Sequence, residues 1–203
     1  MDLFNFLFPK KCLECGREGK YICKECFQKV PPSGWTDKEV FSLYRYQGVI
    51  RKAIIALKYK FALDIARELA DLCVERLLTT NHWPSAILVP VPLYWYRQNF
   101  RGFNQSEEIG KTIAQKMGWK FIPDLVIRKK FTAPQTELSG PARRRNLKDV
   151  FALNPNYLST DLLIYSSIIV FDDVLTTGST LKEAAKVLRN TGVKTIWGLT
   201  IAR

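Results

Sequence analysis

The segment from residue 168 to residue 202 constrains the fold more than any other part of the chain. It begins with a short apolar run, IIVF, and continues through two aspartates and a hydroxyl-rich turn, LTTGST. It then takes the apolar spacing of an amphipathic helix, for which Gly192 is a stop signal, before a second apolar run, KTIWGLTIA. A strand, a helix and another strand in this order imply parallel strands. The segment therefore predicts an α/β fold, with a parallel sheet flanked by helices.

The rest of the chain continues this alternation. Strands are predicted in EVFSLYRYQG, as a short edge or hairpin strand, in SAILVPVPL, and around DLVIRK. Two helices are predicted between residues 49 and 78, with a break near residues 59–63, and a third in NQSEEIGKTIAQKMG, where Gly118 ends it. Residues 129–150 have no clear period, which indicates a long loop, and loops of this length inside a domain are commonly functional.

The chain carries a strong and uneven positive charge. Its 203 residues suffice for one substantial domain and a small appendage, and 31 basic against 19 acidic residues leave a net charge of +12. Between residues 97 and 148, twelve basic residues accompany four acidic ones. Such a surface attracts phosphate-bearing partners, either nucleic acid or small phosphorylated molecules. A solvated basic surface that serves solubility explains the charge equally well.

The first residues, MDLFNFLFPKK, are apolar but do not resemble a secretory signal, because the lysines follow the apolar part and no small-residue cleavage site is present. No apolar run approaches the roughly 18 residues that a membrane span needs. We expect a cytoplasmic protein. The apolar side chains predict a segment that docks on the protein body, with a membrane-surface anchor as the alternative, which would place the protein at the inner face of the membrane: Leu3, Phe4, Phe6, Leu7 and Phe8.

Four of the five cysteines form two C-x2-C pairs within CLECGREGKYICKEC. Two such pairs complete a closed tetrahedral zinc site, the structural type, with ligands Cys12, Cys15, Cys23 and Cys26. Two disulfides or a redox role fit less well, since nothing marks the protein as secreted. We expect residues 1–34 to form a zinc-binding segment and residues 35–203 the larger domain. Cys73 lies on an apolar helical face and is predicted to be a core residue.

The turn after residue 173 has the composition of a phosphate-binding loop. In parallel α/β sheets, ligands bind beyond the carboxyl ends of the strands, where a helix begins with unpaired N–H groups. Gly178 allows the backbone to turn toward a ligand, and the neighbouring hydroxyl side chains add donors: Thr176, Thr177, Ser179 and Thr180. Asp172 and Asp173 suit sugar hydroxyls or a divalent cation instead. A sugar phosphate with a bound metal ion satisfies both halves of the motif.

Two simpler interpretations explain less of this motif. A hydrophilic turn with an ordinary helix N-cap explains one hydroxyl, but it does not explain two adjacent acids at the end of a buried strand. A Walker-B-like strand requires a G-x4-G-K-[ST] motif elsewhere, and the chain has none.

IIVFDDVLTTGST resembles the phosphoribosyl pyrophosphate signature of type I phosphoribosyltransferases. The chain as a whole resembles the ComF (ComFC) competence family within that superfamily, over nearly its full length. CLECG…CKEC, YRYQGVIRKAIIALKYK, VPVPLYWYRQNFRGFNQSEEIG, FTAPQTELSGPARRRNLKDVF and the signature occur in the family's order. One departure is Phe61, which stands where the family commonly has glycine after LKYK, so that ligand contacts by Lys58 or Lys60 stay undefined.

The resemblance implies a role for each matching segment. Asp172 and Asp173 would contact the ribose hydroxyls, directly or near magnesium, as the catalytic pair. Residues 89–93 would form the pyrophosphate loop, and residues 128–150 a mobile hood that matches the family at Thr132, Gln135, Leu138, Arg144 and Asn146. The residues expected to bind phosphoribosyl pyrophosphate are Val174, Leu175, Thr176, Thr177, Gly178, Ser179, Thr180, Val91, Pro92, Leu93, Arg97, Arg101, Asn104 and Gln105, of which the last four would meet the pyrophosphate or the acceptor.

Three functional hypotheses follow. The first is a phosphoribosyltransferase whose acceptor the sequence does not identify, with magnesium and a structural zinc. The second is a non-catalytic competence factor that uses the site as a ligand sensor and binds single-stranded DNA or DNA-uptake proteins, for which the basic charge and the aromatic residues of YWYRQNF are suited. The third is an inactive scaffold, against which the intact Asp172 and Asp173 argue. The single histidine, His82, is predicted to be a surface residue, which leaves a Ser-His-Asp mechanism without support.

Overall fold

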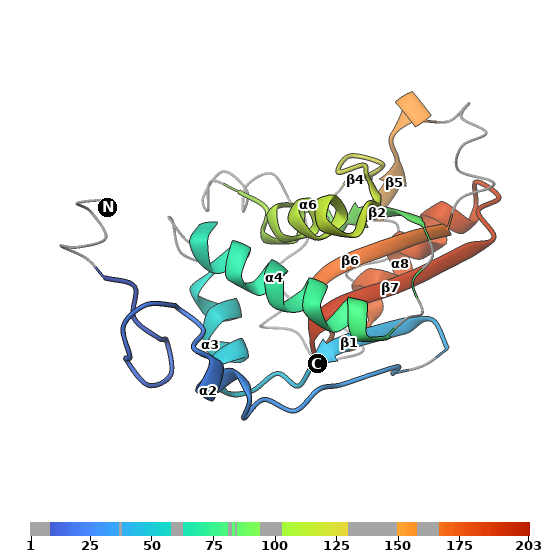
Figure 1. Ribbon diagram of the computed structural model, residues 1–203. Helices are drawn as coiled ribbons and strands as arrows, with labels where there is room; N and C mark the ends of the chain where they lie inside the picture. The colour runs from blue at the N-terminus through green and yellow to red at the C-terminus, as the bar shows by residue number, and fades with distance from the viewer. Residues whose placement is uncertain are drawn as a thin grey trace.

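The computed structural model describes residues 9–36, 38–57, 63–80, 83, 85–93, 103–129, 150–157 and 167–203. Their centre is a five-stranded sheet in the order β1-β7-β6-β2-β3, in which every neighbouring pair is parallel (Figure 1). The strands are β1 (Val40–Tyr44), β2 (Ala86–Pro90), β3 (Lys120–Phe121), β6 (Ser167–Val174) and β7 (Thr195–Ala202). The predicted parallel α/β fold is confirmed.

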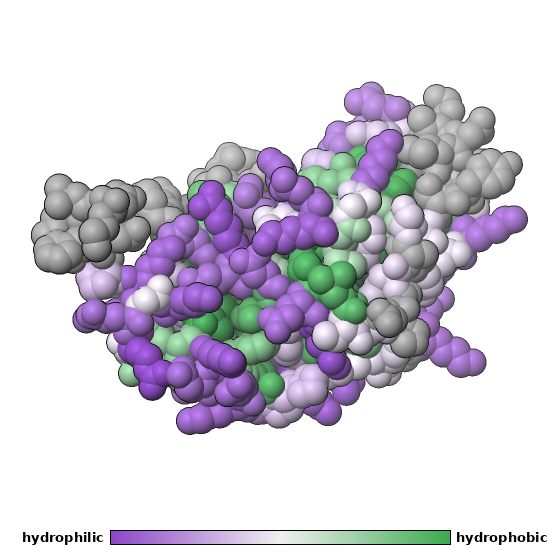
Figure 2. Space-filling model, viewed as in Figure 1, coloured by the Kyte–Doolittle hydropathy of each residue, from purple (hydrophilic) through white to green (hydrophobic). Residues whose placement is uncertain are grey.

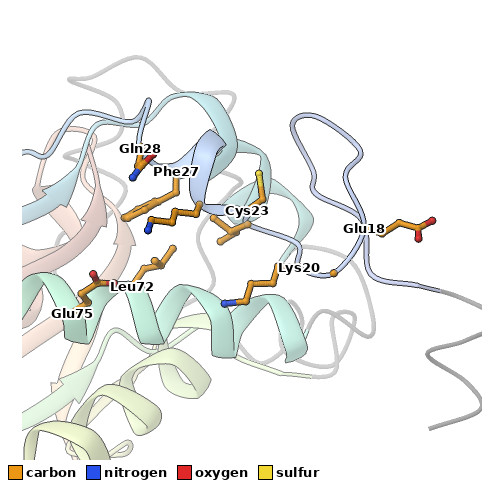
Figure 3. Close-up of a pocket in the computed structure, with 10 residues that line it drawn as sticks. Glu18, Lys20, Cys23, Phe27, Gln28, Leu72 and Glu75 are labelled. Atoms are coloured by element: carbon orange, nitrogen blue, oxygen red, sulfur yellow. The ribbon is translucent and has the colours of Figure 1, made fainter. Parts of the chain in front are cut away.

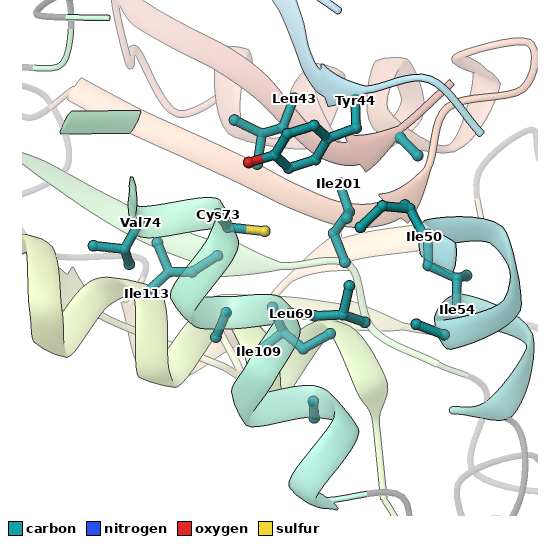
Figure 4. Close-up of a cluster of buried hydrophobic side chains, with 14 of the residues drawn as sticks. Leu43, Tyr44, Ile50, Ile54, Leu69, Cys73, Val74, Ile109, Ile113 and Ile201 are labelled. Carbon is teal, nitrogen blue, oxygen red and sulfur yellow. The ribbon is translucent and has the colours of Figure 1, made fainter. Parts of the chain in front are cut away.

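Helices cover both faces of the sheet. Helices α3 (Gly48–Ala56), α4 (Leu63–Thr80) and α6 (Gln105–Met117) pack on one face, and α8 (Ser179–Arg189) packs on the other. Successive residues of β6 alternate between the two cores, since Ile169 and Phe171 join the first, and Ile168 and Val170 the second. Figure 4 shows the first core, where side chains of α3, α4 and α6 meet those of the sheet.

Two strand predictions need correction. The strand predicted around DLVIRK is β4 (Val126–Arg128), and it lies outside the parallel sheet, paired antiparallel with β5 (Phe151–Leu153). The short strand β3, which pairs with β2, was not predicted. The strand predicted in EVFSLYRYQG is β1, which pairs in parallel with β7 at the edge of the sheet. On its other side, β1 makes antiparallel bridges to the preceding segment, between Pro32 and Tyr44 and between Trp35 and Phe41, as a hairpin strand does.

The three helices predicted between residues 49 and 118 are present in the structure. The predicted helix before Gly118 is α6, and Gly118 ends it in the left-handed conformation, with φ of 69°. The two predicted helices between residues 49 and 78 are α3 and α4. A 3-10 turn, η2 (Pro155–Tyr157), follows the β4–β5 ribbon.

The four-cysteine segment packs directly on α3 and α4. It contains the short helix α2 (Lys24–Phe27), and its buried side chains join the same core as the sheet residues Phe41 and Leu43. Glu68 of α4 accepts hydrogen bonds from the backbone N–H groups of Tyr21 at 3.2 Å and Ile22 at 2.9 Å. Residues 9–34 therefore share a hydrophobic core with the sheet.

An aromatic cluster lies at the amino-terminal end of the sheet. Its centre is Trp83, whose ring stacks on Trp35 at 5.9 Å and lies 6.1 Å from Trp119 and 5.9 Å from Trp197. The ring of Phe41 contacts Trp83 edge to face at 5.7 Å. The cluster is therefore at the end of the sheet opposite to the carboxyl ends of the strands.

Candidate functional site

The two aspartates belong to the last residues of β6, so the strand extends beyond the predicted range of 168–171. Asp172 Oδ1 accepts hydrogen bonds from the Ser106 hydroxyl at 3.2 Å and from the backbone N–H of Asp173 at 2.9 Å. Asp173 Oδ1 accepts one from the backbone N–H of Val174 at 2.7 Å. Both carboxyls are half-buried at the carboxyl edge of the sheet. Ser106 is a neighbour that the sequence analysis missed, because nothing in the sequence links α6 to the end of β6.

The pKa of Asp172 is raised to about 8, mainly because burial removes water from the carboxylate and also because the charge of Asp173 lies beside it. The hydrogen bonds from Asp173 N–H and from Ser106 work in the opposite direction but are outweighed. Two adjacent carboxyls in this environment favour a single negative charge near pH 7. Added hydrogen-bond donors or a cation would favour full ionisation.

The amino end of α6 lies beside the acids and holds two of the predicted ligand contacts in place. Asn104 caps the helix, since its Oδ1 accepts from Ser106 N–H, and its Nδ2 donates to the carbonyl of Val91 at 3.2 Å. Gln105 Nε2 donates to the carbonyl of Leu57 at 3.3 Å. Both side chains are buried, and both amides tie segments together. A ligand contact by either residue stays a prediction.

The predicted pyrophosphate loop follows β2 directly. The backbone N–H of Val91 donates to the carbonyl of Phe171 at 2.8 Å, which extends the pairing of β2 with β6 by one residue. Pro92 and Leu93 are half-buried. The loop and the acids thus lie at the ends of adjacent strands, as the parallel arrangement requires.

The hydroxyl-rich turn connects β6 to α8. Gly178 is the N-cap of α8, with φ of 71°, a conformation that glycine adopts without strain. No side chain caps the helix, and its first turn has no acidic residue. Thr177 and Ser179 share a hydroxyl hydrogen bond of 2.8 Å, and Thr177 Oγ1 also accepts a long hydrogen bond of 3.4 Å from the Ser179 backbone N–H. The helix therefore begins with N–H groups that an anion could accept from.

A cavity of about 390 Å³ lies against this turn. Thr176, Thr177 and Gly178 line it from the turn, and three cationic residues line it from other elements: Arg45 after β1, Lys182 in α8 and Arg203 after β7. The sequence analysis missed these cations, because they come from three separate segments and only the sheet order brings them together.

The four predicted metal ligands form one cluster. The sulfur atoms of Cys12, Cys15, Cys23 and Cys26 all lie within 4.8 Å of one another, and no disulfide joins them. The Sγ atoms of Cys15 and Cys23 are 3.7 Å apart. Tetrahedral thiolates at about 2.3 Å from a zinc ion lie roughly 3.8 Å from one another, whereas a disulfide requires about 2.05 Å. The donor set and its spacing therefore fit a closed metal site.

The thiols of this cluster differ strongly in acidity. Burial works to raise the pKa of Cys12, but hydrogen bonds from the backbone of Cys15, Cys23 and Glu14 lower it to about 6. Burial and the neighbouring thiols raise the pKa of Cys26. Without a cation, the cluster disfavours more than one thiolate, which is the condition that a metal ion relieves.

A larger cavity, of about 450 Å³, lies between the four-cysteine segment and α4. Figure 3 shows Phe27 and Leu72 at its apolar wall, with Lys20 and Glu75 around it. In Figure 2, apolar surface is visible there between hydrophilic side chains. This cavity contains neither the aspartates nor the hydroxyl turn.

Several predicted site residues lie outside the described residues. These are Arg97, Arg101, His82, Lys58, Lys60, Phe61 and residues 130–149 of the hood predicted for residues 128–150, with its matching positions Thr132, Gln135, Leu138, Arg144 and Asn146. In the described ranges, no helix has both the length and the apolar character to span a membrane.

The fold and the site together define a class of protein. It is an α/β protein with a parallel sheet, and paired acids and a cation-lined cavity lie at the carboxyl edge of that sheet. It also has a four-cysteine cluster with the geometry of a metal site. The chain is 36% identical to competence protein F of Haemophilus influenzae over 201 residues, 94% of this chain and 84% of that protein. It is 31% identical to the DNA utilization protein YhgH of Escherichia coli K12 over 192 residues, 91% of this chain and 80% of that protein. The chain therefore belongs to the competence protein F family, and the resemblance inferred from its motifs is confirmed.

No protein-family model matches the chain. Among solved structures, adenine phosphoribosyltransferase from Leishmania donovani is similar with a TM-score of 0.43 and 16% identity, over 83% of this chain and 73% of that one. Glutamine phosphoribosylpyrophosphate amidotransferase from B. subtilis is similar with a TM-score of 0.44 and 13% identity, over 72% of this chain and 30% of that one.

Proposed function

We propose that this protein binds phosphoribosyl pyrophosphate with magnesium and transfers the phosphoribosyl group to an acceptor during DNA uptake. The observation that carries the proposal is the junction of β6 and α8, where two half-buried carboxyls precede an uncapped, hydroxyl-rich helix start. This arrangement offers hydrogen-bond acceptors for a sugar diol and hydrogen-bond donors for its phosphate within residues 172–180.

The chain's own residues would bind and orient the sugar. Asp172 and Asp173 accept hydrogen bonds from the ribose 2′- and 3′-hydroxyls, while the N–H and hydroxyl groups of the turn bind the 5′-phosphate. The bond from the sugar C1 to the pyrophosphate oxygen breaks, a bond from C1 to the acceptor nucleophile forms, and the acceptor loses a proton. Positive charge develops at the sugar during this exchange, and the nearby carboxylates stabilise it.

Magnesium, when bound, neutralises charge on the departing pyrophosphate. The raised pKa of Asp172 supports a ligand of this kind, because a pair of acids that resists full ionisation is stabilised by a cation or by hydroxyl donors. The four cysteines are proposed to hold structural zinc, which stabilises the fold of residues 9–34 and takes no part in the transfer.

Calorimetry with magnesium and phosphoribosyl pyrophosphate tests the site. The double variant Asp172→Asn, Asp173→Asn keeps the shape of both side chains but removes their charge, and we expect at least a hundredfold loss of affinity. Asp71→Asn with Glu75→Gln, two exposed acids on α4, removes the same charge elsewhere and is expected to bind as the wild type does. Equal affinity of the two double variants would refute the assignment.

The enzymatic half of the proposal needs a separate test. Pyrophosphate release would be followed with phosphoribosyl pyrophosphate and candidate acceptors, including single-stranded DNA. Acceptor-dependent release identifies a transferase. Tight binding without release for any acceptor would favour the sensor hypothesis instead.

A second candidate is a single-stranded DNA-binding competence factor, favoured by the names of the relatives, competence and DNA utilization, and by the net charge of +12. Binding through backbone phosphates should weaken linearly when the logarithm of affinity is plotted against that of salt concentration. A protein that binds no single-stranded DNA at low salt would exclude this candidate.

A further inference from the structure

The cavity beside the hydroxyl turn continues past the place proposed for the 5′-phosphate. The turn lines it with Thr176, Thr177 and Gly178, and three cationic residues line it as well: Lys182 of α8, and Arg45 and Arg203 directly after β1 and β7. These two strands lie on the side of β6 opposite to β2 and the predicted pyrophosphate loop. Arg45 and Arg203 are therefore on the side of β6 away from the predicted pyrophosphate loop.

The charge of this cavity is not balanced by the described part of the protein. None of the residues that line it is acidic. Within the described ranges, Arg45, Lys182 and Arg203 form no ion pair, and the nearby Glu39 is paired with Arg189 at 2.6 Å. Arg203 Nε donates to the Ser33 hydroxyl at 2.8 Å, which orients this side chain without neutralising it. The cavity thus brings three cationic side chains together, with which a bound anion could pair.

Its size also exceeds what one phosphate requires. A volume of about 390 Å³ lies in the range of roughly 300–1,000 Å³ that is typical of pockets for whole small molecules. A phosphate monoester carries about two negative charges near pH 7, for which the turn and a single cation suffice. Three cations around a larger space fit a ligand that continues beyond its 5′-phosphate with a second phosphoryl group.

We propose that Arg45, Lys182 and Arg203 form a second anion subsite, which binds a phosphoryl group attached through the 5′-phosphate of the ligand. The inference rests on the proposed function in one respect, the placement of the 5′-phosphate at the turn. The ligand then extends past the sugar phosphate on the β1 side, as in a nucleoside 5′-diphosphate or in a nucleic-acid strand, where the next phosphate follows along the backbone. Both sources present the same chemistry to the subsite.

Calorimetry with three uridine ligands, without added magnesium, tests this subsite. Uridine 5′-monophosphate carries only the 5′-phosphate, the 5′-diphosphate adds a phosphoryl group directly, and the 5′-phosphorylated dinucleotide pUpU adds one through a strand. We expect the wild type to bind at least one of the two extended ligands about tenfold more tightly than the monophosphate. Tighter binding of pUpU would identify a strand, and tighter binding of the diphosphate a nucleotide.

The double variant Arg45→Ala, Lys182→Ala should reduce this tenfold preference to less than twofold. Both side chains are exposed, so the variant should fold. The matched control is Lys120→Ala with Lys194→Ala, which removes the same charge from exposed positions at the amino ends of β3 and β7. A wild type without the preference, or a control that loses it equally, would overturn the subsite.

The two proposals fail in different ways. Asp172→Asn with Asp173→Asn should weaken all three uridine ligands by a similar factor and leave the preference intact. If these substitutions weaken none of the ligands while Arg45→Ala, Lys182→Ala still abolishes the preference, the sugar site is wrong and the anion subsite stands.

Discussion

At the scale of single residues, the paired aspartates are expected to lower the stability of the folded protein when Asp172 ionises. Asp172 is half-buried beside Asp173, and both carboxyls accept hydrogen bonds from their own strand. Burial and the adjacent charge raise the pKa of Asp172 to about 8. The folded protein therefore holds a proton at this carboxyl that the unfolded chain releases near pH 4.

The variant Asp172→Asn should be more stable than the wild type, and increasingly so as pH rises. Because the folded pKa lies above the unfolded one, ionisation opposes folding, and the wild type loses free energy of unfolding between about pH 4 and pH 8. Asparagine mimics the protonated carboxyl and removes this dependence. Thermal unfolding without magnesium should give melting temperatures that agree near pH 4 and that increasingly favour the variant as pH rises to 8.

The matched comparison is Asp124→Asn, an exposed carboxyl whose partners are Asn154 and Tyr157. The Asp124→Asn variant is not expected to gain stability relative to the wild type as pH rises. If the difference between Asp172→Asn and the wild type were constant with pH, the carboxyl would be ionised throughout the range, and the account of the pair would fail.

At the scale of elements, α6 lies unusually close to the sheet, and a glycine makes this possible. A Cβ atom on Gly110 would lie 2.8 Å from Leu88 Cδ2 and 3.3 Å from Phe171 Cδ1, in β2 and β6. The same strands end at the predicted pyrophosphate loop and at the aspartates. The approach of α6 therefore sets the position of Ser106 and Asn104 at the site.

The substitution Gly110→Ala should destabilise the protein by about 1–3 kcal/mol, although alanine favours a helix by about 1 kcal/mol relative to glycine. The cost arises because the helix must move away from Leu88 and Phe171. Chemical denaturation measures the change, with the exposed Lys111→Ala in the same helix as control. A stabilised Gly110→Ala variant would show that the helix moves without cost.

A second element-scale prediction concerns the four-cysteine segment, which α4 holds through Glu68. Replacement by alanine leaves the N–H groups of Tyr21 and Ile22 without their acceptor, at a cost of roughly 1–3 kcal/mol. Hydrogen exchange at these two amides should accelerate. Glu75→Ala, an exposed change on the same helix, should leave it unaltered; acceleration in both variants would mean that Glu68 is not the anchor.

The sequence predicted elements well where local signals agreed with the fold. The apolar run at residues 168–171 and the helix stop at Gly118 both match the structure, because burial and glycine conformation are local requirements. The two-residue strand β3 carries no periodic pattern of its own and exists only through pairing with β2. The cations Arg45, Lys182 and Arg203 could not be predicted as a group, since their proximity depends on strand order. The aspartates and the cysteines could be predicted, because each set lies within one short segment.

At the scale of the whole molecule, the two ends of the sheet carry different groups of residues, and the four-cysteine segment shares the core on one of its faces. The acids, the turn and the cationic cavity lie at the carboxyl edge, while the aromatic cluster closes the amino edge. The buried cysteines Cys12, Cys23 and Cys26 belong to the same core as the sheet. Metal binding at the four-cysteine segment should therefore stabilise the whole protein rather than the first residues alone.

Removal of the metal should lower the melting temperature of the protein in a single transition. Folding and metal binding are linked when the unfolded chain lacks the site, so the loss should be several kcal/mol. Differential scanning calorimetry before and after chelation measures it, and elemental analysis should find one zinc per chain, lost in Cys12→Ser. Cys73→Ala, a buried cysteine outside the cluster, should retain the metal. Two separate transitions would show that the four-cysteine segment folds independently.

The aromatic cluster also has an optical consequence. Four of the five tryptophans, Trp35, Trp83, Trp119 and Trp197, lie within about 6 Å of a neighbouring indole, close enough for their electronic transitions to couple and for excitation to pass between them. Their near-ultraviolet circular dichroism should therefore be intense and should vanish on unfolding. The fifth, Trp95, follows the predicted pyrophosphate loop by two residues. Occupation of the carboxyl edge should leave the coupled band unchanged, and any spectral response to a ligand should disappear in Trp95→Phe.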